Sequence, residues 1–218
     1  MKAWRPIAIA ALAFAAAGPL FAPRLLAFPY SEQIGADRIW ATAPISRPAL
    51  ASVLADANHR VAASPLAQGA EGRDIYLTDG GWRWLWLANS ARDSFALTRP
   101  MGEAVVVNRT DLATATVANP AGGNRTRTLP AIIAHEKCHG MLRRHFGLTV
   151  DFLKPQWLRE GYCDHVAGES TLDDAEAARL LAERRSHPAL PYYLGRRKVE
   201  AGLLANGNNV DRLFDEAR

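Results

Sequence analysis

Four short stretches in the first half of the chain carry the pattern of β-strands. The first alternates polar and apolar side chains and ends before Pro44, and the last two flank a turn at residues 100–102. The predicted strands cover residues 37–43, 73–78, 95–98 and 103–108. Between them, Ser46 is placed to cap a helix over residues 47–62, and Asp79 to cap a shorter helix that includes Trp82.

Apolar residues at helical spacing dominate the second half. A Gly- and Asn-rich stretch at residues 118–127 lacks any periodicity and is predicted to be a loop. The helices predicted after it cover residues 129–146, 157–168, 172–186, 189–204 and 210–217. Strands followed by helices are typical of an α+β fold, here a small N-terminal mixed sheet with helices and then a mainly helical C-terminal half. No repeat or linker divides residues 29–218, so we expect one domain there.

The first 28 residues are predicted to direct export. Lys2 and Arg5 precede an apolar run over residues 7–17 that Gly18 and Pro19 interrupt, which is the order of a secretory signal. Small residues allow cleavage before Gly18. The 17 residues from position 7 to position 23 are at the lower limit for crossing a bilayer, so an uncleaved anchor is the alternative.

The composition suggests where the exported chain resides. Arginine outnumbers lysine 22 to 4 and alanine is abundant, which hints at a GC-rich bacterial genome. We therefore expect a periplasmic protein, or one anchored to the outer face of the inner membrane.

The net charge argues against a nucleic-acid partner. The chain has 26 basic and 22 acidic residues, a formal charge of +4. Three of the basic residues and none of the acidic ones lie in the first 28 positions, so the remaining 190 residues have a net charge of +1. A nearly neutral body offers no basic surface for phosphate groups.

The candidate chemistry begins with the motif HEKCH at residues 135–139, a match to H-E-x-x-H. His135 and His139 are four residues apart. On a helix, residues at this spacing lie on one face, so both imidazoles can bind one metal ion. Glu136 is about 100° away around the helix, beside the metal and within reach of a water. Pro130 suits the first turn of this helix, and Gly147 suits its C-terminal end.

A second motif supplies further candidate ligands. The chain reads WLREGYCD from residue 157 to residue 164, so that Glu160 follows His139 by 21 residues. H-E-x-x-H followed about twenty residues later by W-L-x-E-G resembles the gluzincin branch of the zinc metallopeptidases. The resemblance implies a zincin-like fold, Glu160 as the third Zn²⁺ ligand, and Asp164 as the residue that orients His135. The spacing of four between Glu160 and Asp164 is compatible with these roles.

The sequence thus predicts a zinc-dependent peptidase that acts on a peptide or protein, with Glu136 as general base. Four side chains are open candidates for a transition-state hydrogen-bond donor: Tyr162, His165, Tyr192 and Tyr193. The strand at residues 103–108 is expected to flank the cleft and to pair with an extended substrate. The alternative is a non-catalytic envelope protein in which zinc clamps two helices together.

The chain has two cysteines, one inside each motif. Cys138 follows His135 by three residues, and Cys163 follows Glu160 by three. Each therefore lies about 60° around its helix from a predicted ligand, beside the face that meets the other helix. A disulfide in an oxidising compartment and two buried free thiols are both open at this point.

Overall fold

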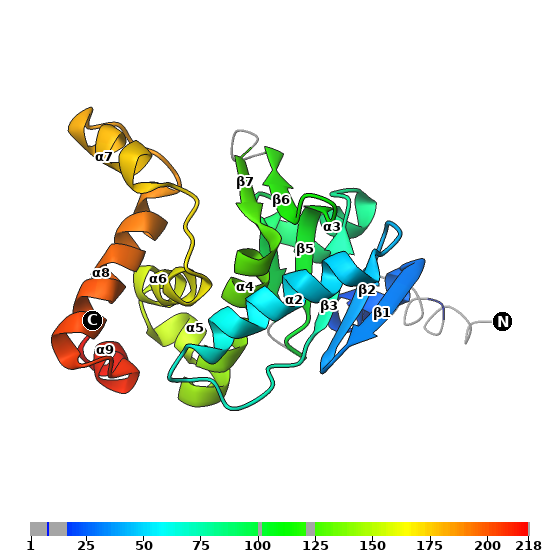
Figure 1. The fold of residues 1–218 in the computed structure, drawn as a ribbon, viewed down its shortest axis with the longest axis horizontal. Coiled ribbons are helices and arrows are strands. Elements are labelled where there is room, and N and C mark those ends of the chain that lie inside the picture. The colour runs from blue at the N-terminus through cyan, green and yellow to red at the C-terminus, as the bar shows by residue number, and fades with distance from the viewer. Residues whose placement is uncertain (1–7, 9–16, 100–101, 121–124, 218) are drawn as a thin grey trace.

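A mixed sheet forms the N-terminal half of the protein (Figure 1). The computed structural model describes residues 8, 17–99, 102–120 and 125–217. Within them the sheet has seven strands: β1 (Tyr30–Ile34), β2 (Asp37–Ala41), β3 (Asp74–Thr78), β4 (Ala96–Thr98), β5 (Val105–Asp111), β6 (Thr116–Asn119) and β7 (Arg125–Thr128). The predicted α+β class, with strands before helices, is confirmed.

The centre of the sheet is parallel and its margins are antiparallel. β2, β3 and β5 run parallel, while β1 pairs antiparallel with β2. β5 is long enough to pair with two strands along one side: its first part pairs with β4, and residues 109–111 pair with β6. β6 in turn pairs with β7. β4 is therefore a short strand with one side unpaired.

Three strands were not predicted, and residues 118–127 were wrongly predicted to be a loop. β6 and β7 pair with each other and contain residues 118–119 and 125–127, while residues 121–124 lie outside the described residues. β7 reads RTRT and has no apolar residue, so its sequence carries no hydrophobic alternation. β1 is mostly exposed, which explains why its pattern is equally weak.

Helices cover both faces of the sheet. α2 (Arg47–Ala62) and α4 (Leu129–Phe146) pack on one face around an apolar core that includes Ile75, Val105 and Val107. α3 (Trp82–Ala88) and the short 3-10 helix η1 (Pro23–Leu26) pack on the other face, and a second 3-10 helix, η2 (Asn89–Ala91), follows α3.

The structure corrects the two predicted N-caps of these helices. Gly81 rather than Asp79 is the N-cap of α3, and Ser46 is at the N-cap of α2 without a side-chain hydrogen bond.

The C-terminal half is helical, as predicted. Its elements are α5 (Val150–Leu153), α6 (Gln156–Ala167), α7 (Asp174–Ala182), α8 (Leu190–Asn206) and α9 (Val210–Glu216). α6 lies between α4 and α8, and α7 lies at the opposite end of α8 from α9 (Figure 1). A Cβ on Gly161 of α6 would lie 2.4 Å from the carbonyl carbon of Gly195 of α8, so glycine at this position permits the close packing of the two helices.

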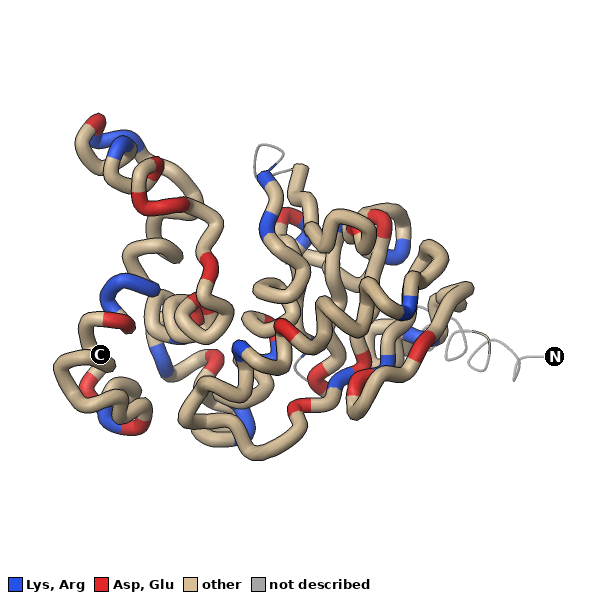
Figure 2. Tube along the Cα trace, in the orientation of Figure 1, with Lys and Arg blue, Asp and Glu red and all other residues tan. Residues whose placement is uncertain are grey.

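The predicted export segment lies mostly outside the described residues, since residues 1–7 and 9–16 are not among them. The following residues pack on the α3 side of the sheet. Arg99 Nε donates to the carbonyl of Leu20 at 3.0 Å, and Arg83 Nε donates to that of Leu26 at 2.8 Å. No helix in the described part of the chain has the length and apolarity to cross a membrane. Basic and acidic residues are interspersed along the trace (Figure 2).

Candidate metal centre

α4 is the central helix of the candidate site because it is buried on two sides. Leu129, Ile132 and Ile133 pack into the core beneath the sheet, whereas Cys138 and Met141 pack into a second core shared with α6, α8 and α9. The remaining face carries the polar side chains of the H-E-x-x-H motif. The helix begins after Thr128 and ends at Gly147, whose φ of 85° is accessible to glycine at little cost.

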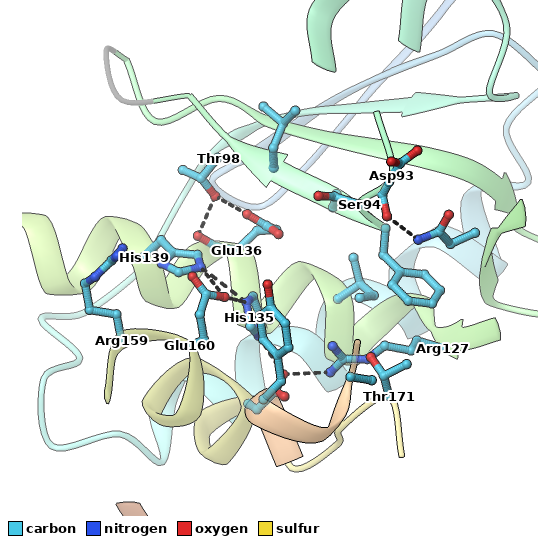
Figure 3. Close-up of a pocket in the computed structure, with 18 of the residues that line it drawn as sticks. Asp93, Ser94, Thr98, Arg127, His135, Glu136, His139, Arg159, Glu160 and Thr171 are labelled. Atoms are coloured by element: carbon cyan, nitrogen blue, oxygen red, sulfur yellow. Dashed lines mark hydrogen bonds and ion pairs between the residues drawn. The ribbon is translucent and has the colours of Figure 1, made fainter. Parts of the chain in front are cut away.

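The structure brings His135, His139 and Glu160 together (Figure 3). Nε2 of His135 lies 3.2 Å from Nε2 of His139 and 3.3 Å from Oε2 of Glu160. Nε2 of His139 lies 3.7 Å from the same carboxylate oxygen. The two histidines come from α4 and the glutamate from α6, so the group forms where these helices face each other.

These three separations fit a tetrahedral metal ion. Ligand atoms about 2.05 Å from a tetrahedral zinc are about 3.3 Å from one another. The observed separations of 3.2, 3.3 and 3.7 Å span that value. Two imidazole nitrogens and a carboxylate oxygen are also a donor set that zinc accepts, and three protein ligands leave a fourth position for water or substrate. The residues present therefore fit Zn²⁺.

Asp164 lies one turn beyond Glu160 on α6 and contacts the ring nitrogen of His135 that does not face the other two ligands. Its Oδ1 lies 2.8 Å from Nδ1 of His135 and 3.1 Å from Nη2 of Arg127. Its Oδ2 accepts a hydrogen bond of 3.0 Å from the hydroxyl of Ser170. A carboxylate at Nδ1 favours the tautomer that leaves Nε2 free to bind a metal.

The protonation of the group reflects its burial and its charges. Burial disfavours the charged forms of both histidines. Asp164 and Glu160 outweigh burial at His135, and Cys163 and Glu160 outweigh it at His139, so each pKa is well above the usual value. The two histidines likewise outweigh burial at Glu160, so the pKa of this carboxyl is well below the usual value. Without a metal, the three side chains thus form an ion-paired cluster.

Glu136 is fixed by a side chain from the sheet. The hydroxyl of Thr98 on β4 lies 2.7 Å from Oε2 of Glu136 and 2.8 Å from its backbone oxygen. Both residues are buried and line the same cleft as the three ligands, and the hydroxyl of Thr98 points at Glu136 (Figure 3). Thr98 lies 38 positions before Glu136, so no local sequence pattern could have predicted this contact.

The group opens into a cleft of about 850 Å³. One wall is the segment from Asp93 to Thr98, which ends in β4, and the other includes residues on α4, α6 and the start of α8. Residues of β6, β7 and α5 also line the cleft. The expectation that residues 103–108 flank the cleft is wrong. None of them lines the cleft, because β5 is paired on both sides and β4 lies between it and the cleft.

The four candidate donors differ in their placement. Tyr192 lines the cleft, and its hydroxyl accepts a hydrogen bond of 3.1 Å from Gln156. Tyr162 is fully buried against Phe214 and bonds to Ser64, so it cannot reach a substrate. Tyr162 follows Glu160 by two residues, which places it about 200° around the helix. The sequence alone could therefore have shown that Tyr162 points away from the proposed ligand.

The remaining two candidates also lie away from the cleft. His165 is on the side of α6 that faces α8, 3.9 Å from Glu200. Tyr193 donates its hydroxyl proton to Asp174 at 2.9 Å. Neither side chain lines the cleft. The structure therefore retains only Tyr192 as a candidate donor.

Cys138 and Cys163 are both free and buried. Both side chains pack into the core that α4 shares with α6. Burial raises the pKa of both thiols. Of the two arrangements left open by the sequence, the structure contains the free thiols, directly behind the second histidine.

Two arginines of the cleft were missed as candidate site residues. Arg143 lies one turn beyond His139 on α4, and Arg159 immediately precedes Glu160 on α6. A helical projection of the two motifs could have placed Arg143 on the histidine face.

No family model, curated protein or solved structure matches the chain.

Proposed function

We propose that this chain is a zinc-dependent peptidase of zincin-like fold. The observation that carries the proposal is the arrangement of His135, His139 and Glu160 at the separations of a tetrahedral zinc site, next to an open cleft. Zn²⁺ bound there would supply a Lewis acid that polarises a carbonyl group and acidifies water. Structural zinc sites usually have four protein ligands, which makes the non-catalytic alternative the weaker one.

Glu136 is the residue that moves protons in this proposal. Glu136 lines the same cleft as the three ligands and follows His135 directly on α4, so its carboxylate is placed to accept a proton from the attacking water and deliver it to the departing amine. Thr98 restricts the carboxylate to this orientation through its hydrogen bond. We therefore assign Thr98 as a positioning residue.

The free side of β4 is suited to holding an extended peptide. Phe95 and Arg99 direct their backbone groups toward β5, since the Phe95 oxygen accepts from Asn108 and the Arg99 nitrogen donates to Ala104, both at 2.8 Å. Alternation along the strand turns the backbone groups of Ala96 and Thr98 away from β5. A substrate strand can add to this edge by main-chain hydrogen bonds and lie over Glu136.

Tyr192 is the proposed donor to the negative oxygen of the transition state. Burial and the carboxylates of Glu160 and Asp164 raise the pKa of Tyr192, so its hydroxyl keeps the proton that it must donate. Export, as predicted from the N-terminal residues, would place the substrate outside the cytoplasm, where peptides and proteins of the envelope are available.

The test is digestion of a mixed peptide library by zinc-loaded protein, with products identified by mass spectrometry. Wild type should cleave peptides, and Glu136→Gln should bind zinc but lose at least about a hundredfold of the rate. Glu200→Gln, which changes the same group outside the cleft, should cleave as wild type does. Full cleavage by zinc-bound Glu136→Gln would contradict the assigned base, and no cleavage by zinc-loaded wild type would contradict the function.

A further inference from the structure

The two ends of the cleft differ in how their arginines are paired. Arg127 and Arg159 lie on opposite sides of the three proposed ligands, with Arg159 on the side of His139 (Figure 3). At the first end, Arg127 binds Asp164 and Glu169, and Arg125 binds Glu176. Three carboxylates therefore pair with two arginines at that end.

At the second end, two arginines share a single carboxylate. Arg143 Nε donates to Oδ2 of Asp151 at 2.7 Å, and Nη1 of Arg159 lies 3.6 Å from the other oxygen. Arg159 Nε also donates to the carbonyl of Lys154 at 3.1 Å. All three charged side chains line the cleft, so this end carries one positive charge in excess.

Both guanidinium groups have donors without partners. The side chain of Arg143 is only 8% exposed, and its Nη1 atom is buried without a hydrogen bond. Nη2 of Arg159 also has no hydrogen-bond partner among the described residues, but unlike Nη1 of Arg143 it is not a buried atom. A buried donor without an acceptor is costly and rare in folded proteins, and a ligand that supplies the acceptor removes the cost.

We propose that Arg143 and Arg159 form a subsite for a carboxylate of the substrate, next to the cleaved bond. Arginine forks recognise carboxylates through paired hydrogen bonds, and Asp151 holds the two forks in place. The proposal rests on the peptidase function and adds its specificity: peptides with an acidic residue or a free C-terminal carboxylate at this position are preferred.

Binding to zinc-loaded Glu136→Gln tests the subsite without cleavage. The probes are four fluorescein-labelled peptides of alanine and leucine, with one central Glu or Gln and with a C-terminal carboxylate or carboxamide. Anisotropy should show the preferred carboxylate binding about tenfold to a hundredfold more tightly than its neutral counterpart. The Glu–Gln pair reports a side-chain carboxylate, and the carboxylate–carboxamide pair reports the terminus.

Variants assign the preference to the arginines. Arg159→Gln should abolish it while zinc content stays unchanged, and Arg159→Glu should reverse it, so that the neutral peptide binds more tightly than its charged counterpart. Arg143→Lys keeps the buried charge but removes the fork, so it should reduce the preference with little loss of melting temperature. Arg212→Gln, an exposed arginine on α9, is the matched control and should keep the full preference.

The outcomes separate this inference from the peptidase function. Equal binding of charged and neutral peptides, or a preference that survives both Arg159→Gln and Arg143→Lys, would overturn the subsite. The function stands or falls separately on cleavage of the peptide library by wild type. If the library is cleaved, its products should show the same acidic preference, and Arg159→Gln should remove it.

Discussion

The sheet region (residues 17–146) and the helical region (residues 147–217) are built in different ways but share one helix. The sheet region has apolar cores on both faces of the sheet, closed by α2, α3 and α4. The helical region has one main core, and α4 supplies part of it. Each region alone contains an incomplete site: His135, His139 and Glu136 belong to the first, and Glu160 and Asp164 to the second.

This difference indicates that the proposed metal ion would join two regions rather than sit within one. Besides apolar packing, polar contacts cross the boundary at His135–Asp164 and Arg127–Glu169. Three of the following predictions each change one connection across the boundary, and the prediction for Thr98 changes a contact within the sheet region.

The largest effect is expected from removing the metal. A ligand bound at about a thousand times its dissociation constant stabilises a protein by about 4 kcal/mol. For a domain of this size that corresponds to roughly 10 °C in melting temperature. Chelation should produce this shift in wild type, and addition of Zn²⁺ should reverse it. An unchanged melting temperature would show that no metal links the regions.

Asp164→Asn should have the next largest effect. Asn keeps the shape of the side chain but weakens its hold on His135 and leaves Arg127 with less compensation. Loss of such an orienting carboxylate typically lowers metal affinity about tenfold to a hundredfold. Zinc titration against a competing chelator measures this change. Ser170→Ala removes only one hydrogen bond to Asp164 and should weaken zinc binding less than Asp164→Asn does.

Thr98→Val should act on catalysis and not on the metal. The substitution removes the hydroxyl that binds Glu136, so we expect kcat to fall about tenfold with KM and zinc content unchanged. Thr98→Ser keeps the hydroxyl and should restore kcat. If the serine variant is as slow as the valine variant, Thr98 has a packing role only.

The smallest effect concerns α7, which contacts the sheet region through an ion pair between Arg125 and Glu176. Hydrogen bonding to Arg125 lowers the pKa of Glu176, so its contribution to stability is present above about pH 4.5 and is lost as pH falls through the lower folded-state pKa. Because the pair is partly exposed, Glu176→Gln should cost less than about 1 kcal/mol in urea unfolding at pH 7. A larger loss would mean that α7 is a tightly integrated part of the fold.

The sequence predicted the parts of the fold and site that depend on local periodicity. The bounds of α2 and α4 follow from apolar residues three and four apart, and both helices have these bounds in the structure. That Glu160 joins His135 and His139 was implied by the resemblance of the two motifs to a known family, and the structure brings these three side chains together. β7 was missed because its strand pairing, and not its own residues, makes it a strand.

The contacts around the site depend on the chain folding back on itself. Thr98 meets Glu136, and Arg143 and Arg159 meet at Asp151, through contacts that only the tertiary structure creates. In contrast, the angle of Tyr162 around the helix was enough to exclude it as a donor without the structure.

Zinc analysis of purified protein tests the central claim most directly. The account predicts about one zinc ion per chain in wild type and loss of most of it in both His139→Ala and Glu160→Ala, which remove a ligand from each region. His165→Ala, a histidine outside the cleft, should keep the wild-type content. Wild type without stoichiometric metal, or ligand variants that retain the full content, would contradict the proposed centre.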